Sequence, residues 1–233
     1  MIAKIGNKIK AENYVTRFAL YILGLFIMTL GVSMSVKSDL VVSPVSSIPY
    51  SITCITGLEM GKATIVFHIG LVLLQILILR SAFRFKNLLQ IAVGVLFGYF
   101  TTFSNYLFSL LPTPENMAIR LLLMLGSTVL IALGIFFYLP ADIIPLAGEG
   151  AMQAVSDKTH IVFNRVKIGF DISMVVISLV SCLLALGSLT SVGVGTVAAA
   201  VLVGVVLGIF TRRFGAKRDE LLHGGIRVPV CQG

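Results

Sequence analysis

The chain has 233 residues, of which 57% are hydrophobic and 12% are charged, and its mean hydropathy is +1.01. Soluble domains carry about 25% charged residues, so this chain has too little polar surface to cover a soluble fold. Its net charge of +8 does not indicate a nucleic-acid partner, because Lys and Arg accumulate in the cytoplasmic loops of membrane proteins. The composition therefore predicts a multi-pass, all-α membrane protein whose main partner is the lipid bilayer.

Six apolar segments are long enough to cross a bilayer, which takes about 20 residues in a helix. They cover residues 17–36, 62–80, 87–105, 118–139, 167–187 and 191–211. The polar stretch before the first segment is unlike a cleaved signal peptide, so we expect the first helix to be retained. Two long connections, 37–61 and 140–166, follow the first and fourth segments and are interrupted by Pro and Gly.

Basic residues are distributed unequally between the two sides of a six-helix topology. The segments before the first helix, between the second and third, before the fifth and after the sixth are rich in Lys and Arg. The opposite side holds only Lys37, Lys62 and Arg120. The positive-inside rule therefore predicts that both termini lie in the cytoplasm.

The two halves of the sequence resemble each other when one is displaced by 103 positions. Glu12, Asn13 and Arg17 match Glu115, Asn116 and Arg120, and Asp39 matches Asp142. Polar matches in one register are much less frequent by chance than matches of Leu or Val. We therefore predict repeats over 1–111 and 112–214, followed by a short tail over 215–233. Because each repeat has three spans, the second is inverted relative to the first.

The interrupted segments 40–56 and 143–156 are equivalent in this repeat. Each could re-enter the membrane and direct helix N-termini at a shared polar or anionic solute; the alternative is an amphipathic helix at the membrane surface. Candidate substrate-binding residues are the polar groups of these segments and two ionisable groups inside spans. They are Ser43, Ser46, Ser47, Tyr50, His68, Glu149, Gln153 and Asp171.

Structural roles compete with binding roles at several positions. His68 could be a neutral imidazole bonded to a neighbouring helix, and Asp171 could pair with Lys167 four residues earlier. We expect Asp39 and Asp142 to cap the short helices that follow them. Two small-residue motifs predict tight packing of the third and sixth helices, with each other or across a homodimer. Their glycines are Gly94, Gly98, Gly204 and Gly208.

Catalytic and metal-binding motifs are missing from the sequence. It has no HExxH, no GxSxG and no Cys–His grouping, and its three cysteines have no paired spacing. We therefore expect neither an enzyme nor a metal, cofactor or disulfide framework.

Two motifs carry a family resemblance. Ser38-Asp39-Leu40 continues to Pro44, and Thr56-Gly57 continues to Gly61 before the next apolar run. Together with the stretch FKNLLQIAVGVLFGYF, they resemble the YczE/YyaS/YitT family of bacterial integral membrane proteins. The resemblance implies a bacterial cytoplasmic membrane location and presumed transport, without naming a substrate.

The leading hypothesis is a transporter or channel that moves a small polar, or anionic, solute by alternating access between inverted repeats. A second hypothesis is the substrate-binding membrane subunit of a larger importer. A third is a non-transporting scaffold or regulator with a glycine-rich helical interface.

Overall fold

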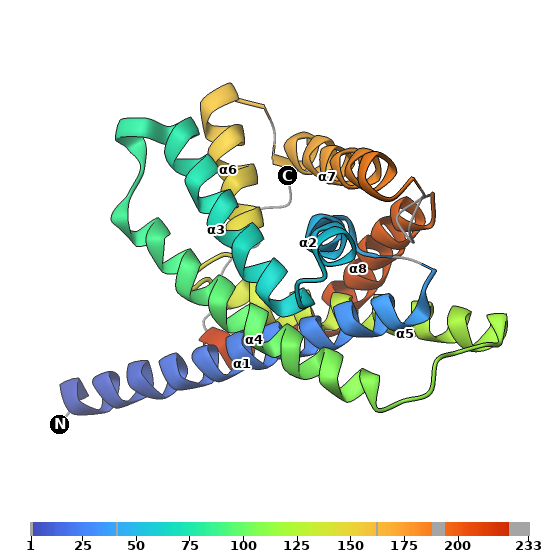
Figure 1. Cartoon of the computed structure of the whole chain (residues 1–233). Helices are drawn as coiled ribbons and strands as arrows, with labels where there is room; N and C mark the ends of the chain where they lie inside the picture. The colour runs from blue at the N-terminus through green and yellow to red at the C-terminus, as the bar shows by residue number, and fades with distance from the viewer. Residues whose placement is uncertain (1, 41, 162, 188–193, 224–233) are drawn as a thin grey trace.

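The computed structural model describes residues 2–40, 42–161, 163–187 and 194–223, and all its regular elements are helical. Figure 1 shows helices inclined in several directions, with α1 and α5 side by side and α2 near the centre. Three short 3₁₀ helices, Arg80–Ala82, Phe85–Leu88 and Leu139–Ala141, lie between the α-helices of the described part. The α-helices are α1 Ile2–Ser38, α2 Pro44–Thr56, α3 Met60–Leu79, α4 Leu89–Ser109, α5 Met117–Tyr138, α6 Ala147–Thr159, α7 Phe163–Leu186 and α8 Val194–His223.

Five helical segments of the described chain are long and apolar enough to cross a membrane. They are Tyr14–Ser38, Met60–Ala82, Phe85–Ser109, Met117–Ala141 and Arg165–Leu186. These correspond to the first five predicted spans, each a few residues longer at one or both ends. The sixth, 191–211, falls partly on α8, but residues 191–193 lie outside the described part. Multi-pass membrane character is thus supported by the helices as well as by the composition.

Each interrupted segment contains one short helix. Ser43 caps α2 by accepting a hydrogen bond from the Ser46 backbone N–H, and Pro44 occupies the first turn, where its missing N–H removes no helical bond. Gly57 ends α2 with φ +70°, a left-handed conformation that glycine adopts without steric cost. Leu146 precedes α6 and provides no side-chain cap. The expectation that Asp39 and Asp142 cap these helices is therefore wrong.

The two aspartates end the preceding helical segments instead. Asp39 and Asp142 have φ values of 52° and 49°, and such left-handed conformations are tolerated by Asp better than by most non-glycine residues. Three residues separate each helix-ending aspartate from the cap of the next short helix, Ser43 or Leu146. The two preceding helical segments therefore end at the aspartates, and the next helices begin after Ser43 and Leu146.

Helices α1 and α5 have the most extensive contact of any two helices in the described part of the chain, and their backbones approach closely. A Cβ atom at Gly134 would lie 2.7 Å from the Gly24 carbonyl oxygen and 2.7 Å from the Met28 backbone nitrogen. At the other end of the crossing, a Cβ atom at Gly31 would lie 2.8 Å from the Ile131 backbone nitrogen. Small residues are what allow two membrane helices to approach this closely.

Several structural elements of the first half recur 103 positions later in the second half, at the displacement that relates the two halves of the sequence. The bounds of α2 and α6 differ by 103 positions at both ends. The left-handed residues correspond too: Asp39 with Asp142, and Gly57 with His160, whose φ is 58°. Packing is also paired, because α3 packs on α6 while α2 packs on α7, and α1 packs on α4 while α5 packs on α8.

The C-terminal part of α8 continues beyond the predicted span and returns to the end of α5. Leu222 is fully buried, and the Arg218 guanidinium lies 4.6 Å from the centre of the Phe136 ring. Arg218 also donates a 3.2 Å hydrogen bond to the Phe136 carbonyl. The predicted tail is therefore helical and packed as far as His223, and residues 224–233 lie outside the described part.

Replacing Gly134 by Ala tests the α1–α5 crossing. The added methyl group meets backbone atoms of α1, which cannot rotate away, so we expect the free energy of unfolding to fall by about 1–3 kcal/mol. Thermal unfolding of detergent-purified protein measures this change. Gly70→Ala is the matched control, because a Cβ atom there meets nothing within 4 Å and helix propensity favours Ala. Equal melting temperatures for Gly134→Ala and the control would show that the crossing is not close-packed.

Candidate functional site

The two short helices begin close to each other. A Cβ atom at Gly148, in the first turn of α6, would lie 3.7 Å from Val45 Cγ1, in the first turn of α2. These two positions are themselves 103 residues apart. Around them, Val45 and Ile48 pack on the apolar cluster that includes Leu71, Ala147 and Ala151. The N-terminal turns thus meet at a centre that apolar side chains fill.

A polar cluster accompanies the N-terminal turn of α6. The Tyr138 hydroxyl donates a 2.5 Å hydrogen bond to Glu149 Oε2 and accepts one of 2.5 Å from the Leu146 N–H. The Tyr21 hydroxyl donates to the Ile144 carbonyl at 2.8 Å. The two tyrosine rings are 5.4 Å apart. Helices α1 and α5 therefore hold the Glu149 side chain at the start of α6.

Burial affects the ionisation of Glu149. It raises the pKa of the Glu149 carboxyl above its ordinary value, because desolvation disfavours the charged form. The Tyr138 hydroxyl, the Lys167 ammonium and the Leu146 N–H stabilise the carboxylate and offset part of this increase. Glu149 is thus a candidate residue whose charge its surroundings control.

A second polar cluster joins α6 to α3 and α4. Gln75 is fully buried and donates to Gln90 Oε1 at 2.8 Å and to the Ala147 carbonyl at 3.1 Å. Its own Oε1 atom has no hydrogen-bond partner among the described residues. A Cβ atom at Gly150 would lie 2.6 Å from Gln90 Oε1, so glycine is needed there for the two amides to reach α6.

The corresponding contact in the other half uses serines. Ser178 on α7, which corresponds to Gln75, donates to the Ser47 carbonyl at 3.0 Å and also bonds Ser51 on α2. The Cys182 thiol donates to Ser51 Oγ at 3.2 Å. Buried hydroxyl groups therefore attach α2 to α7, as buried amides attach α6 to α3.

The predicted site residues of the two short helices lie in several different environments. Ser43 and Ser46 are at the start of α2, Ser47 is in its contact with α7, and Tyr50 packs on the main apolar cluster of α1 and α5. Glu149 lies in the tyrosine cluster. Gln153 is exposed and donates to Asp157 at 2.7 Å. The start of α2 and the start of α6 are brought together, but Gln153 points elsewhere.

The two ionisable residues inside spans contact their own helices and α4. Asp171 forms the predicted ion pair with Lys167, at 2.9 Å, and its Oδ1 atom has no partner among the described residues. His68 is buried against Gly94 and between the rings of Phe67 and Phe97. Its Nδ1 atom is also without a partner among the described residues, so the predicted bond to a neighbouring helix is not made by this atom.

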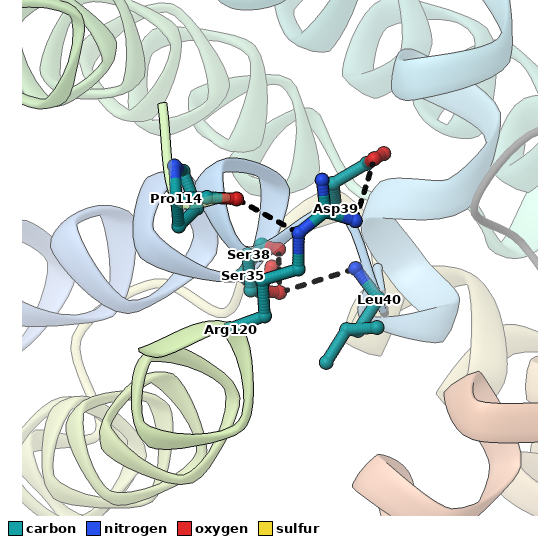
Figure 2. Close-up of polar contacts among 6 residues, drawn as sticks. All are labelled: Ser35, Ser38, Asp39, Leu40, Pro114 and Arg120. Atoms are coloured by element: carbon teal, nitrogen blue, oxygen red, sulfur yellow. Dashed lines mark hydrogen bonds and ion pairs between the residues drawn. The ribbon is translucent and has the colours of Figure 1, made fainter. Parts of the chain in front are cut away.

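Arginines near the starts of the spans Tyr14–Ser38 and Met117–Ala141 bond the opposite helix at the two ends of the α1–α5 contact. Figure 2 shows Arg120, from the start of α5, reaching the Asp39 carboxylate at 3.4 Å and the Pro114 carbonyl at 2.9 Å. At the opposite end, Arg17 donates two hydrogen bonds, of 3.2 and 2.6 Å, to the Ala141 carbonyl, next to Asp142. These equivalent arginines have structural roles at the two ends of one helix pair.

The sequence interpretation missed several residues of these clusters. Tyr21, Tyr138, Gln75, Gln90 and Ser178 have no charge and belong to apolar spans. A signal was nevertheless present, because two glutamines inside otherwise apolar spans need partners in the membrane interior. Which partners they have depends on the fold.

A pH titration of stability tests the position of Glu149. A raised pKa in the folded state means that the folded chain binds this proton more tightly than the unfolded chain does. The resulting stabilisation is complete below the ordinary value of 4.5 and is lost as the pH rises through the raised value. We therefore expect melting temperature to fall over this interval for the native chain and to stay more nearly level for Glu149→Gln.

Glu115 provides the matched control for this experiment, because its side chain is exposed rather than buried. Glu115→Gln should retain the pH profile of the native chain. A profile for Glu149→Gln that coincides with the native one would contradict the assignment.

Comparison with known proteins places the chain in a family. The model of a family of unknown function, DUF6198, matches residues 15–212. The chain is also 27% identical, over 197 residues, to the "Uncharacterized membrane protein YczE" of Bacillus subtilis strain 168, covering 84% of this chain and 86% of that protein. No solved structure gives a significant match. The predicted resemblance to YczE-type membrane proteins is therefore confirmed, and the chain belongs to the DUF6198 family.

Proposed function

We propose that this membrane protein is a transporter or channel for small polar solutes, anionic ones above all, and that it works by alternating access between two inverted repeats. The repeats are 1–111 and 112–214, with α8 as the sixth span. Both termini then lie in the cytoplasm of a bacterium, in agreement with the charge distribution. Such repeats place substrate sites near the middle of the membrane, between the halves.

The paired bounds, backbone conformations and helix contacts support duplication. Each half contains a long helix, a left-handed aspartate, a 13-residue helix and two further long helices. An odd number of spans in each half inverts the second half. The short helices α2 and α6 would then approach the midplane from opposite faces of the membrane.

The charge preference of the site follows from the meeting of these helix starts. The first backbone N–H groups of a helix lack internal partners, and the helix dipole places partial positive charge there. Two such ends meet near Val45 and Gly148. In this structure apolar side chains close the centre, so a solute would enter only after α2 and α6 separate. An anion or a strong hydrogen-bond acceptor would be held best.

One difference between the halves carries the proposal of alternating access. In the first half, α3 covers the two glycines of α4: a Cβ atom at Gly94 would lie 2.7 Å from His68 Cβ, and one at Gly98 would meet Ile65. In the second half, Cβ atoms at Gly204 and Gly208 would meet no described residue within 4 Å.

This difference corrects the predicted packing of the glycine motifs. The partner of Gly94 and Gly98 is α3 rather than α8. Helices α7 and α8 share no comparable packing among the described residues. Ile65 covers Gly98 in the first half, and the residue of α7 that corresponds to it, Ile168, is 60% exposed.

The two halves would exchange their covered and bare glycine motifs when the transporter changes from opening on one side of the membrane to opening on the other. Helix α7 would cover Gly204 and Gly208 as α3 now covers Gly94 and Gly98, and α3 would part from α4. Because α7 is attached to α2 and α3 to α6, each short helix would move with its partner. The centre between Val45 and Gly148 would then be accessible from alternate sides in turn.

Cysteine cross-linking tests this exchange. Ile65 and Gly98 are in contact. Their counterparts are Ile168, at the displacement of 103, and Gly208, because the two glycine motifs begin at Gly94 and Gly204 and so match at a displacement of 110. Ile168→Cys with Gly208→Cys should therefore form an intramolecular disulfide in membranes, although the two are apart here. The background replaces Cys54, Cys182 and Cys231 by Ala. Single-cysteine variants are the controls. Failure of this pair to cross-link within one chain, with added solutes or without, would contradict the exchange.

Solute flux tests the function itself. Reconstituted protein should move at least one member of a panel of small anionic and polar solutes well above the leak of protein-free liposomes. The disulfide between positions 168 and 208 should stop this flux, and a reductant should restore it, because one state would be locked. Leak-level flux over the whole panel would contradict transport.

The bare glycines of α8 also favour a second candidate, a non-transporting membrane scaffold or regulator. A GxxxG motif open to lipid can receive a partner helix, including that of a second copy. The same cross-linking experiment distinguishes the two: disulfides between two chains through Gly208→Cys alone support the interface. The importer-subunit alternative stays a prediction, for which co-purification with an ATPase is the test.

A further inference from the structure

An open groove lies between the end of α6 and the start of α7. Its volume is about 570 Å³, within the size range of small-molecule sites. The walls are mainly apolar, and one cationic group and one hydroxyl complete them. The lining residues are Val155, Ile161, Arg165, Val166, Gly169, Phe170 and Ser173.

A glycine opens this groove on the α7 side. A Cβ atom at Gly169 would meet nothing within 4 Å among the residues that the structure describes, so Gly169 leaves space beside it. The next lining residues along α7, Val166 and Phe170, are buried or half-buried and form an apolar wall. The shape and chemistry suit a hydrocarbon chain better than a polar solute.

The cation at the groove is exposed and has no ion-pair or hydrogen-bond partner within the described ranges. Arg165 has two carboxylates within eight residues along the chain, and both are engaged: Asp157 accepts from Gln153 at 2.7 Å, and Asp171 pairs with Lys167 at 2.9 Å. In contrast, Arg17, Arg120 and Arg218 all have internal partners. The Arg165 guanidinium is available to an external anion.

The groove lies where a lipid headgroup would lie. Arg165 is the first residue of the span Arg165–Leu186, and the last turns of α6 beside it expose polar groups, Asp157 and Lys158 among them. Further along α7, Ile168 and Ile172 are exposed and apolar. The groove therefore extends from a polar boundary into an apolar zone, with its cation at the boundary.

We propose that this groove binds one anionic glycerophospholipid, with an acyl chain along Val166, Gly169 and Phe170 and the phosphate on Arg165. Arginine suits this role because its planar guanidinium bonds phosphate oxygens in pairs. The site requires only that α7 spans the membrane, so it is independent of any transported solute.

Lipid binding to the purified full-length chain tests the proposal. Native mass spectrometry in a neutral detergent would compare phosphatidylglycerol with phosphatidylcholine of identical acyl chains. We expect the native chain to prefer phosphatidylglycerol and Arg165→Gln to lose about fivefold of this preference, the ratio that about 1 kcal/mol per basic group gives. Gly169→Leu should reduce binding of the anionic lipid by filling the groove.

Matched controls separate this site from general lipid adhesion. Arg84→Gln removes an exposed arginine elsewhere, and Gly70→Leu adds the same side chain at a glycine of α3 that is equally open. Both should bind lipid as the native chain does. Inorganic phosphate at millimolar concentration should not compete, because the apolar wall contributes to binding.

The proposal would be overturned by unchanged lipid preference in Arg165→Gln together with unchanged binding in Gly169→Leu. Full competition by inorganic phosphate would equally overturn it, because the site would then bind a free anion. Melting curves in detergent establish that each variant is folded, and Gly169→Leu should remain folded since the space is empty and leucine favours helix.

Discussion

The close crossing of α1 and α5 is the constraint on which the rest of the structure depends. Gly24, Gly31 and Gly134 allow the two backbones to approach until a single added Cβ atom would collide with main-chain atoms. Arg17 and Arg120 then reach the far ends of the opposite helices. With this pair in place, α4 packs on α1 and α8 packs on α5, so each half of the chain is assembled on one member of the crossing.

The positions of the short helices α2 and α6 also depend on the contact between α1 and α5. Each short helix follows α1 or α5 after an aspartate in the left-handed conformation, which ends the long helix. The starts of α2 and α6 then meet at Val45 and Gly148. Buried hydroxyl groups of Ser47, Ser51 and Ser178 attach one short helix to α7, and two glutamines attach the other to α3. In a membrane interior such contacts are retained because water cannot replace them. Each short helix and its partner can therefore move as a unit.

The unequal packing of α4 and α8 makes the two halves of the structure different from each other. One glycine motif is covered and the other is bare, although the helices that carry them have equivalent places on the crossing. Under the proposed repeat, the two halves are equivalent in sequence but differ in arrangement, and a second arrangement of similar energy would be one in which the halves exchange roles. This is the physical basis for alternating access in the proposed function.

The sequence alone determined the membrane character, five spans, the family and the locations of both short helices. These follow from local properties: a run of apolar residues spans a bilayer whatever its neighbours, and Ser-Pro before an apolar turn starts a helix. The Lys167–Asp171 pair was predictable for the same reason, because its partners are one helical turn apart. The 103-residue displacement was also visible, although polar matches alone do not establish how the halves pack.

Tertiary structure decided everything that depends on which helices are neighbours. Gly94 and Gly204 have the same sequence pattern, yet one is covered by His68 of α3 and the other is bare, since the motif permits contact without selecting a partner. Asp39 was expected to cap α2, but Arg120, 81 residues away, lies against it and Ser43 takes the cap. Tyr138 and Gln75 became part of the candidate site only because the crossing brings α6 beside them. Local pattern determines which residues form helices, whereas the packing of helices in space determines which side chains meet.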